Sequence, residues 1–103
     1  MNLENFLNKL IKYDGFILID SNHNKFLIGK PLKEKPITVK LLDKSLNYKL
    51  LLYPDLYFGE AYTNGSLVIE NGTLTEFLEI SLRNIGRRDI NIYGKIFNKL
   101  KGT

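Results

Sequence analysis

Turn and cap signals at fixed spacing from Pro54 to Glu76 constrain the fold of this chain more than any other feature. Proline is tolerated only in the first turn of a helix, so Pro54 ends one helix or starts the next. Asn64-Gly65 and Asn71-Gly72 are strong turn signals, because both residue types tolerate positive φ, and they bracket a short strand over residues 66–70. Thr73-Leu74-Thr75-Glu76 is a capping box. The sequence therefore predicts a helix, a turn, a strand, a turn and a capped helix in that order.

Each of the two helices around this unit has an apolar face. The earlier one begins at Asp43 and meets the next helix in a corner at Pro54, and its inner face comprises Leu46, Leu50 and Leu51. The capped helix runs from Leu74 to about Arg83, and its inner face comprises Leu74, Phe77, Leu78 and Ser81. Serine is small enough to permit close packing there.

An amphipathic helix is predicted at the amino terminus. Its apolar residues recur at helical spacing, with polar residues between them, and they are Leu3, Phe6, Leu7, Leu10 and Ile11. Such a stripe can insert in a membrane interface or cover a sheet, and a single apolar face on a short helix favours the sheet. Asp14-Gly15 then interrupts the helix.

Three short runs of apolar residues predict strands. Residues 16–20 and 25–29 flank the polar loop Ser21-Asn22-His23-Asn24, which is typical of a hairpin. Residues 37–41 alternate and predict a third strand. His23 is the only histidine, and its position in a polar loop favours a turn residue over a catalytic or metal-binding one.

These elements predict an α+β fold in which a small antiparallel sheet packs with several helices in a single domain. The 103 residues are 44% hydrophobic, which suffices for one modest core. The chain has no cysteine, so disulfides and thiolate metal sites are excluded. It has neither a secretory signal nor a run of about 18 apolar residues. We therefore expect a cytoplasmic protein, with a peripheral position at the inner membrane face as an option.

The basic excess is confined to the end of the chain. Residues 83–103 carry six basic side chains against Asp89, a net charge of +5, whereas residues 1–82 carry nine basic and ten acidic side chains, a net charge of −1. The candidate contacts in this basic amphipathic tail are Arg87, Arg88, Lys95 and Lys99. Three explanations stay open: anionic phospholipid headgroups, an acidic face of another domain, or a solvated helix face.

Catalytic machinery is not recognisable in the sequence. The eight glycines are dispersed and include no Gly-x-Gly pair, so the glycine-rich turn that approaches a nucleotide cofactor is missing. The single histidine lacks a plausible nucleophile, and no cluster has metal-ligand spacing. Basic residues do not interleave with strand aromatics, which disfavours nucleic acid as a partner. We expect no catalytic residue, metal or cofactor in this chain alone.

Glu60 and Tyr62 form the one polar pair that merits separate weighing, because they flank an alanine with a buried pattern. Glu60 could bind the amine of a lipid headgroup or a partner domain. Structurally, it could instead accept from backbone N–H groups of the Asn64-Gly65 turn while the Tyr62 ring packs in the core. The structural interpretation is favoured.

The segment Gly59-Glu60-Ala61-Tyr62-x-x-Gly65, in its setting of strands and capped helix, resembles the amino-terminal domain of cyclopropane-fatty-acyl-phospholipid synthases and related S-adenosylmethionine-dependent lipid methyltransferases. The resemblance runs from about Tyr13 to Arg83 and includes Asp14-Gly15, Gly29 and the strand at residues 37–39. Family members usually have Met-Asp where this chain has Thr63-Asn64, and asparagine preserves the turn.

The resemblance implies a mixed helix-and-sheet module, similar to sterol-carrier folds, that precedes a Rossmann-like catalytic domain. Residues 1–83 would be the non-catalytic domain, which presents lipid or docks, and residues 84–103 a basic tail or linker toward a catalytic domain absent from this sequence. S-adenosylmethionine is expected only in that catalytic domain, so no family catalytic residue is carried over. The alternative is a freestanding protein-interaction module whose basic tail docks an acidic partner.

Overall fold

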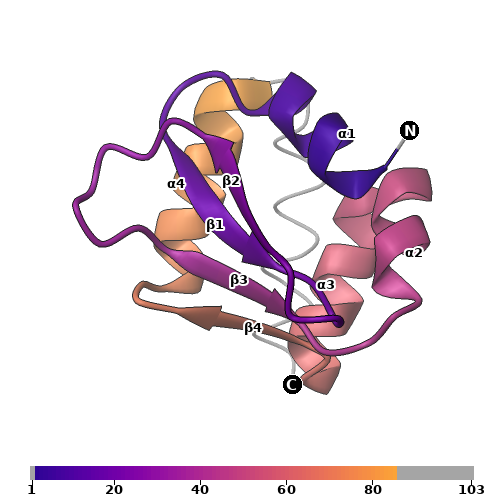
Figure 1. The fold of residues 1–103 in the computed structure, drawn as a ribbon. Helices are drawn as coiled ribbons and strands as arrows, with labels where there is room; N and C mark the ends of the chain where they lie inside the picture. Colours follow the sequence, from indigo (N-terminus) through magenta and orange to yellow (C-terminus); the bar gives the residue numbers. More distant parts are fainter. Residues whose placement is uncertain (1, 86–103) are drawn as a thin grey trace.

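The computed structural model describes residues 2–85, which form an α+β domain of four helices and a four-stranded sheet (Figure 1). In chain order the elements are α1 (Leu3–Leu10), β1 (Gly15–Ile19), β2 (Lys25–Gly29), β3 (Thr38–Leu41), α2 (Leu46–Leu52), α3 (Pro54–Asn64), β4 (Leu67–Glu70) and α4 (Leu74–Ile85). The predicted α+β fold class is confirmed.

The sheet is mixed, whereas an antiparallel sheet was predicted. Its strand order is β2-β1-β3-β4, and the pairs β1/β2 and β3/β4 are antiparallel, but β1 and β3 run parallel. The hairpin register explains the parallel pair, because Gly29 at the end of β2 lies opposite Gly15 at the start of β1. The loop of residues 30–37 then carries the chain past that start to the other edge of β1. From there β3 runs in the same direction as β1.

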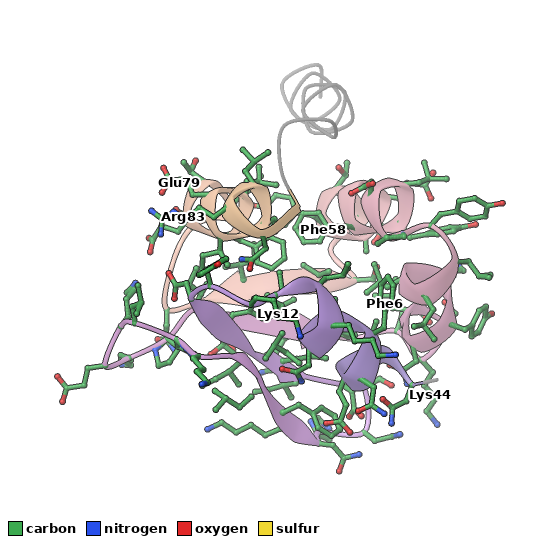
Figure 2. The ribbon with its side chains drawn as sticks, turned by 90° about the horizontal axis from the view of Figure 1, so that it is seen from above. Phe6, Lys12, Lys44, Phe58, Glu79 and Arg83 are labelled. Atoms are coloured by element: carbon green, nitrogen blue, oxygen red, sulfur yellow. The ribbon has the colours of Figure 1, made fainter. Side chains whose placement is uncertain are left out.

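One face of the sheet is buried under helices. In Figure 1, α3 and α4 lie behind the sheet, and Figure 2 shows both helices on one side of the strands. The buried strand residues on this face are Phe16, Leu18, Ile28, Val39, Leu41 and Leu67. The helices and their ends contribute Leu3, Ile11, Leu46, Leu50, Phe58, Ala61, Leu78 and Ile80 to the same core. Burial of this apolar surface is the main force that holds the two layers together.

The amino-terminal helix α1 packs against the edge strand β2 and helix α2, which confirms the prediction that its stripe belongs to the core. Leu3 is buried, and Phe6, Leu7 and Leu10 pack partly buried against the core. The Asn8 side chain fixes α1 to the edge strand β2, because its Oδ1 accepts from the backbone N–H of Gly29 at 2.9 Å. Asn8 thus provides an acceptor for one of the backbone N–H groups that an edge strand leaves without a strand partner.

The helix–proline–helix corner is confirmed. Helix α2 ends at Leu52, and Pro54 occupies the first turn of α3. Backbone N–H groups in a first turn have no acceptor within the helix, so proline, which has no N–H, costs no hydrogen bond there. The Asn64-Gly65 turn forms where it was predicted, and only one of its two residues has positive φ. Asn64 is the last helical residue, and only Gly65 is left-handed, with φ 85°. Gly65 therefore ends α3 as a helix cap.

The capping box starts α4 as predicted. The Thr73 hydroxyl accepts from the backbone N–H of Glu76 at 3.1 Å, and the Glu76 carboxylate lies 3.4 Å from the same hydroxyl. The predicted inner face is also confirmed, with Leu78 and Ser81 buried and two further members partly buried. The Ser81 hydroxyl donates to the carbonyl of Phe77 at 3.0 Å, so its burial leaves no polar group unpaired.

His23 is a turn residue, in agreement with the prediction. It is exposed, has φ 66°, and donates its backbone N–H to the Asp20 carbonyl at 3.0 Å. The Asp20 carboxylate in turn accepts from the backbone N–H groups of Asn22 and Asn24, both at 2.9 Å. The polar loop therefore closes the hairpin through its own side chains.

The predicted basic tail of residues 84–103 lies mostly outside the described residues. Helix α4 continues two residues past the expected end near Arg83 and reaches Ile85. Within residues 2–85, no helix has the length and apolar character needed to cross a bilayer.

Candidate functional site

The segment Gly59-Glu60-Ala61-Tyr62-x-x-Gly65, which carries the family resemblance, lies in α3 and at the end of that helix. Phe58, Gly59 and Ala61 are buried in it, and both small residues let the helix approach its neighbours closely. At its end the Thr63 hydroxyl donates to the Gly59 carbonyl at 2.8 Å, and Asn64 Oδ1 accepts from the Ser66 backbone N–H at 2.9 Å. These contacts define the exit from α3 into β4.

An aromatic stack joins α3 to α4. The Phe58 ring lies 4.8 Å from the Phe77 ring at an interplanar angle of 12°, and 6.4 Å from the Tyr62 ring at 15°. Phe77 also meets Phe16 of β1 edge-on, with ring centroids 5.1 Å apart. Figure 2 shows Phe58 between the two helices. Tyr62 thus packs at the margin of the core, as the structural interpretation of this residue predicted.

The structure does not bring the predicted site residues together into one described site. Glu60 and Tyr62 are both half-buried on α3. A contact between Glu60 and the Asn64-Gly65 turn, or between Glu60 and a lipid or partner, stays a prediction. Arg87, Arg88, Lys95 and Lys99 lie outside the described residues.

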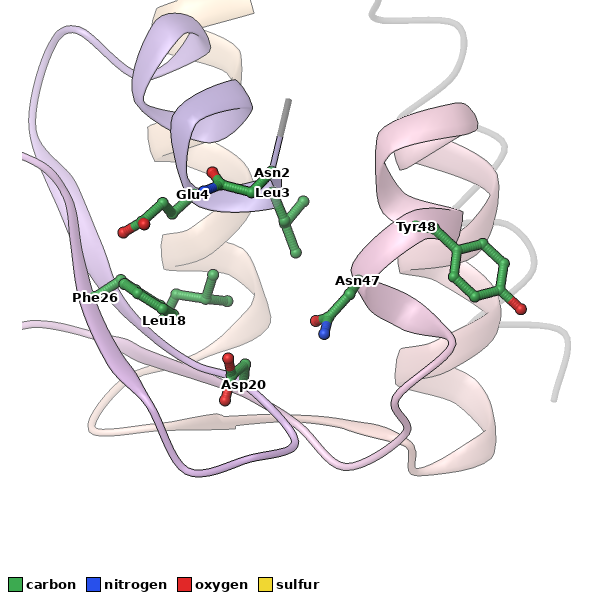
Figure 3. A pocket seen from close by; sticks show the side chains of 8 residues that line it. All are labelled: Asn2, Leu3, Glu4, Leu18, Asp20, Phe26, Asn47 and Tyr48. Carbon is green, nitrogen blue, oxygen red and sulfur yellow. The ribbon is translucent and has the colours of Figure 1, made fainter.

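A pocket of about 220 Å³ opens between the start of α1, the β1–β2 hairpin and α2 (Figure 3). Its residues are Asn2, Leu3, Glu4, Leu18, Asp20, Phe26, Asn47 and Tyr48. In Figure 3, the Asn47 side chain points toward the pocket, whereas the Tyr48 ring points away from it. The pocket therefore combines an apolar wall with two carboxylates and two amides, groups that suit a small ligand with N–H donors.

Three polar groups of this pocket already have structural roles. The Asp20 carboxylate holds the hairpin loop through Asn22 and Asn24, and Asn2 caps α1 by accepting from the Asn5 backbone N–H at 2.9 Å. Glu4 lies in the first turn of α1, where a negative charge interacts favourably with the helix dipole. No sequence pattern predicts the pocket, because its residues come from separate segments that no spacing rule connects.

In the described part of the chain, no three side chains of histidine, cysteine, aspartate or glutamate lie close enough together to hold a metal ion. Comparison of the sequence and the structure with protein-family models, with curated proteins and with solved structures found no match.

Proposed function

We propose that this chain is a non-catalytic lipid-presenting or docking domain of a lipid methyltransferase that resembles cyclopropane-fatty-acyl-phospholipid synthase. The observation that carries the proposal is the segment Gly59-Glu60-Ala61-Tyr62-x-x-Gly65 followed by a strand and a capped helix. The fold supports it, since α3, β4 and α4 form one consecutive unit with Gly59 and Ala61 buried. S-adenosylmethionine would bind in the partner catalytic domain.

The test begins with the source DNA beyond the codon for Thr103. The expected result is a methyltransferase sequence that continues the frame or occupies the neighbouring one. That methyltransferase should then convert phospholipid acyl chains faster with this domain than without it, and should co-purify with it where the two are separate chains. The proposal fails if no methyltransferase frame is adjacent, or if the domain affects neither binding nor turnover.

A second candidate function is a freestanding protein-interaction module, and one surface favours it. Large apolar side chains at the corner of α2 and α3 are 52% to 66% exposed, and they are Tyr48, Leu52, Tyr53 and Leu56. Exposed aromatic and aliphatic groups of this kind mark interaction surfaces when they lie together. A stop codon after Thr103 with no methyltransferase frame nearby would favour this candidate over the first.

A further inference from the structure

The sheet carries helices on one face only in the part of the chain that the structure describes. In Figure 1, α3 and α4 lie behind the strands and α1 and α2 beside them, and no described helix crosses in front. The pairing registers place eight side chains on this open face in two rows across the sheet. One row is Lys25, Ile19, Lys40 and Val68, and the other is Leu27, Ile17, Thr38 and Glu70. We name these eight residues, of which Thr38 is buried at 6% exposure, the open sheet face.

Half of the open sheet face is aliphatic. Leu27 is 61% exposed and Val68 is 37% exposed, although both lie within strands, and Ile17 and Ile19 between them are half-buried. The alternation of a sheet with one solvated face would place polar residues at these positions. Four aliphatic residues there indicate a surface that another apolar phase or molecule contacts.

Charge accompanies this apolar surface. Lys25 is exposed, and Lys40 lies between Ile19 and Val68 in its row, 3.7 Å from the Glu70 carboxylate. The open sheet face as a whole carries Lys25 and Lys40 against Glu70, a net charge of +1.

The helical layer has the opposite charge. Helices α3 and α4 carry Asp55, Glu60, Glu76 and Glu79 against Arg83, a net charge of −3. Figure 2 shows Glu79 on the side of α4 that points away from the sheet. The domain is therefore polarised across its layers, with its positive side toward the open sheet face. An anionic surface would be attracted to that side and repelled by the other.

We propose that the open sheet face binds the surface of an anionic phospholipid bilayer, with Leu27 and Val68 in the interface and Lys25 and Lys40 at the headgroups. Lysine stems and aliphatic side chains on one flat surface suit a boundary between acyl chains and phosphates. The proposal rests on the lipid-presenting part of the proposed function, and it adds an orientation in which α3 and α4 face away from the membrane.

The experiment is a vesicle-binding titration of the whole chain. The vesicles contain an equal mixture of phosphatidylglycerol and phosphatidylcholine, and pure phosphatidylcholine vesicles serve as the neutral reference. The basic residues of the tail are present in every variant, so the ratio of partition coefficients between variants reports on the folded domain alone. No methyltransferase is added, so failure here is distinct from failure of the proposed function.

Two substitutions test the face, and each has a matched control outside it. Lys25→Gln and Thr75→Glu both change the net charge by one unit, and Thr75 is exposed in the first turn of α4. Leu27→Gln and Leu32→Gln both replace an exposed leucine, at 61% and 78% exposure, and Leu32 lies in the loop of residues 30–37. All four sites are exposed, and circular dichroism with thermal melting checks that each variant folds.

The expected result is that Lys25→Gln and Leu27→Gln each lower the partition coefficient into anionic vesicles roughly fivefold, while Thr75→Glu and Leu32→Gln leave it nearly unchanged. Binding to neutral vesicles should be much weaker. The proposal is overturned if the chain does not bind anionic vesicles, or if the face variants bind like the original chain. It is also overturned if Leu27→Gln instead dissociates a dimer, which would assign the face to a second copy.

Discussion

The side chain of Asn84, near the end of α4, pairs with the backbone of Tyr13, 71 residues earlier in the chain. Asn84 Oδ1 accepts from the Tyr13 N–H at 2.7 Å, and Asn84 Nδ2 donates to the Tyr13 carbonyl at 2.8 Å. The same Oδ1 also accepts from the Lys12 N–H at 2.6 Å. One carboxamide therefore fixes the connection between α1 and β1 to the helical layer, and it satisfies three backbone groups where no regular element can.

Replacing Asn84 with alanine is expected to lower the free energy of unfolding by about 1–3 kcal/mol, because several hydrogen bonds to backbone groups are lost together. Urea unfolding followed by circular dichroism measures the change. Asn22→Ala, at an exposed asparagine in the hairpin loop, is the control and should stay within about 0.5 kcal/mol of the original. Equal stability of the two variants would show that the pairing of Asn84 with Tyr13 contributes nothing.

Two glycines with left-handed backbone should respond differently to alanine. Gly29 has φ +69°, and a Cβ there would lie 2.4 Å from the Asp14 carbonyl oxygen and 2.9 Å from the Ile11 side chain. Gly65 has φ +85°, but a Cβ there would meet nothing within 4 Å. Gly65→Ala bears only the strain of the left-handed conformation, whereas Gly29→Ala adds a backbone clash.

We therefore expect Gly65→Ala to reduce the free energy of unfolding by about 1 kcal/mol and Gly29→Ala by about 3 kcal/mol or more. Denaturant midpoints of the two variants, measured side by side, check the order. A smaller loss for Gly29→Ala than for Gly65→Ala would contradict the close approach of β2 to the Asp14 backbone.

Local signals account for the parts of the fold that the sequence predicted. The capping box Thr73 to Glu76 fixes the start of α4 through contacts three residues apart, and Pro54 restricts its own backbone, so both effects are readable without the rest of the chain. The spacing of Leu3 to Ile11 likewise identifies a buried helix face from periodicity alone.

The parts that were missed depend on contacts between distant segments. The parallel pairing of β1 with β3 follows from the path of residues 30–37, which no strand pattern encodes. The side chain of Asn84 finds its partners 71 residues away, and the pocket near Asp20 collects separate segments. The open sheet face likewise depends on the strand registers, which place Leu27 beside Ile17. Within the candidate site, packing of Tyr62 was predictable, whereas the role of Glu60 depends on a partner.

Phe77 is expected to be a principal contributor to the contact between the layers, because its ring meets both Phe58 and Phe16. Phe77→Ala should reduce the free energy of unfolding by about 3 kcal/mol, and Phe77→Leu by about 1 kcal/mol, since leucine keeps much of the volume. Leu32→Ala is the control, because Leu32 is 78% exposed. Urea unfolding of the three variants measures the effect, and similar midpoints for Phe77→Ala and Leu32→Ala would contradict the packing.

The pKa of the Glu76 carboxyl is expected to be lower than that of a free glutamate. The Lys33 ammonium, which donates to Glu76 Oε2 at 2.9 Å, holds the pKa of this carboxyl below its usual 4.5, and hydrogen bonds from Thr73 act in the same direction. A carboxyl whose pKa is lower in the folded state stabilises the fold above its unfolded pKa. That contribution is lost as the pH falls from 4.5 through the lowered value.

Lys33→Gln is therefore expected to raise the pKa of Glu76 toward 4.5 and to reduce the loss of stability on acidification. Carboxyl carbon shifts in an NMR titration report the pKa directly. Asp43 is the internal control, because the backbone N–H of Ser45, at 2.9 Å, lowers the pKa of Asp43 independently of Lys33. The pKa of Asp43 should be unchanged in the variant. If the pKa of Glu76 were also unchanged, the ion pair that joins the loop before β3 to α4 would not form in solution.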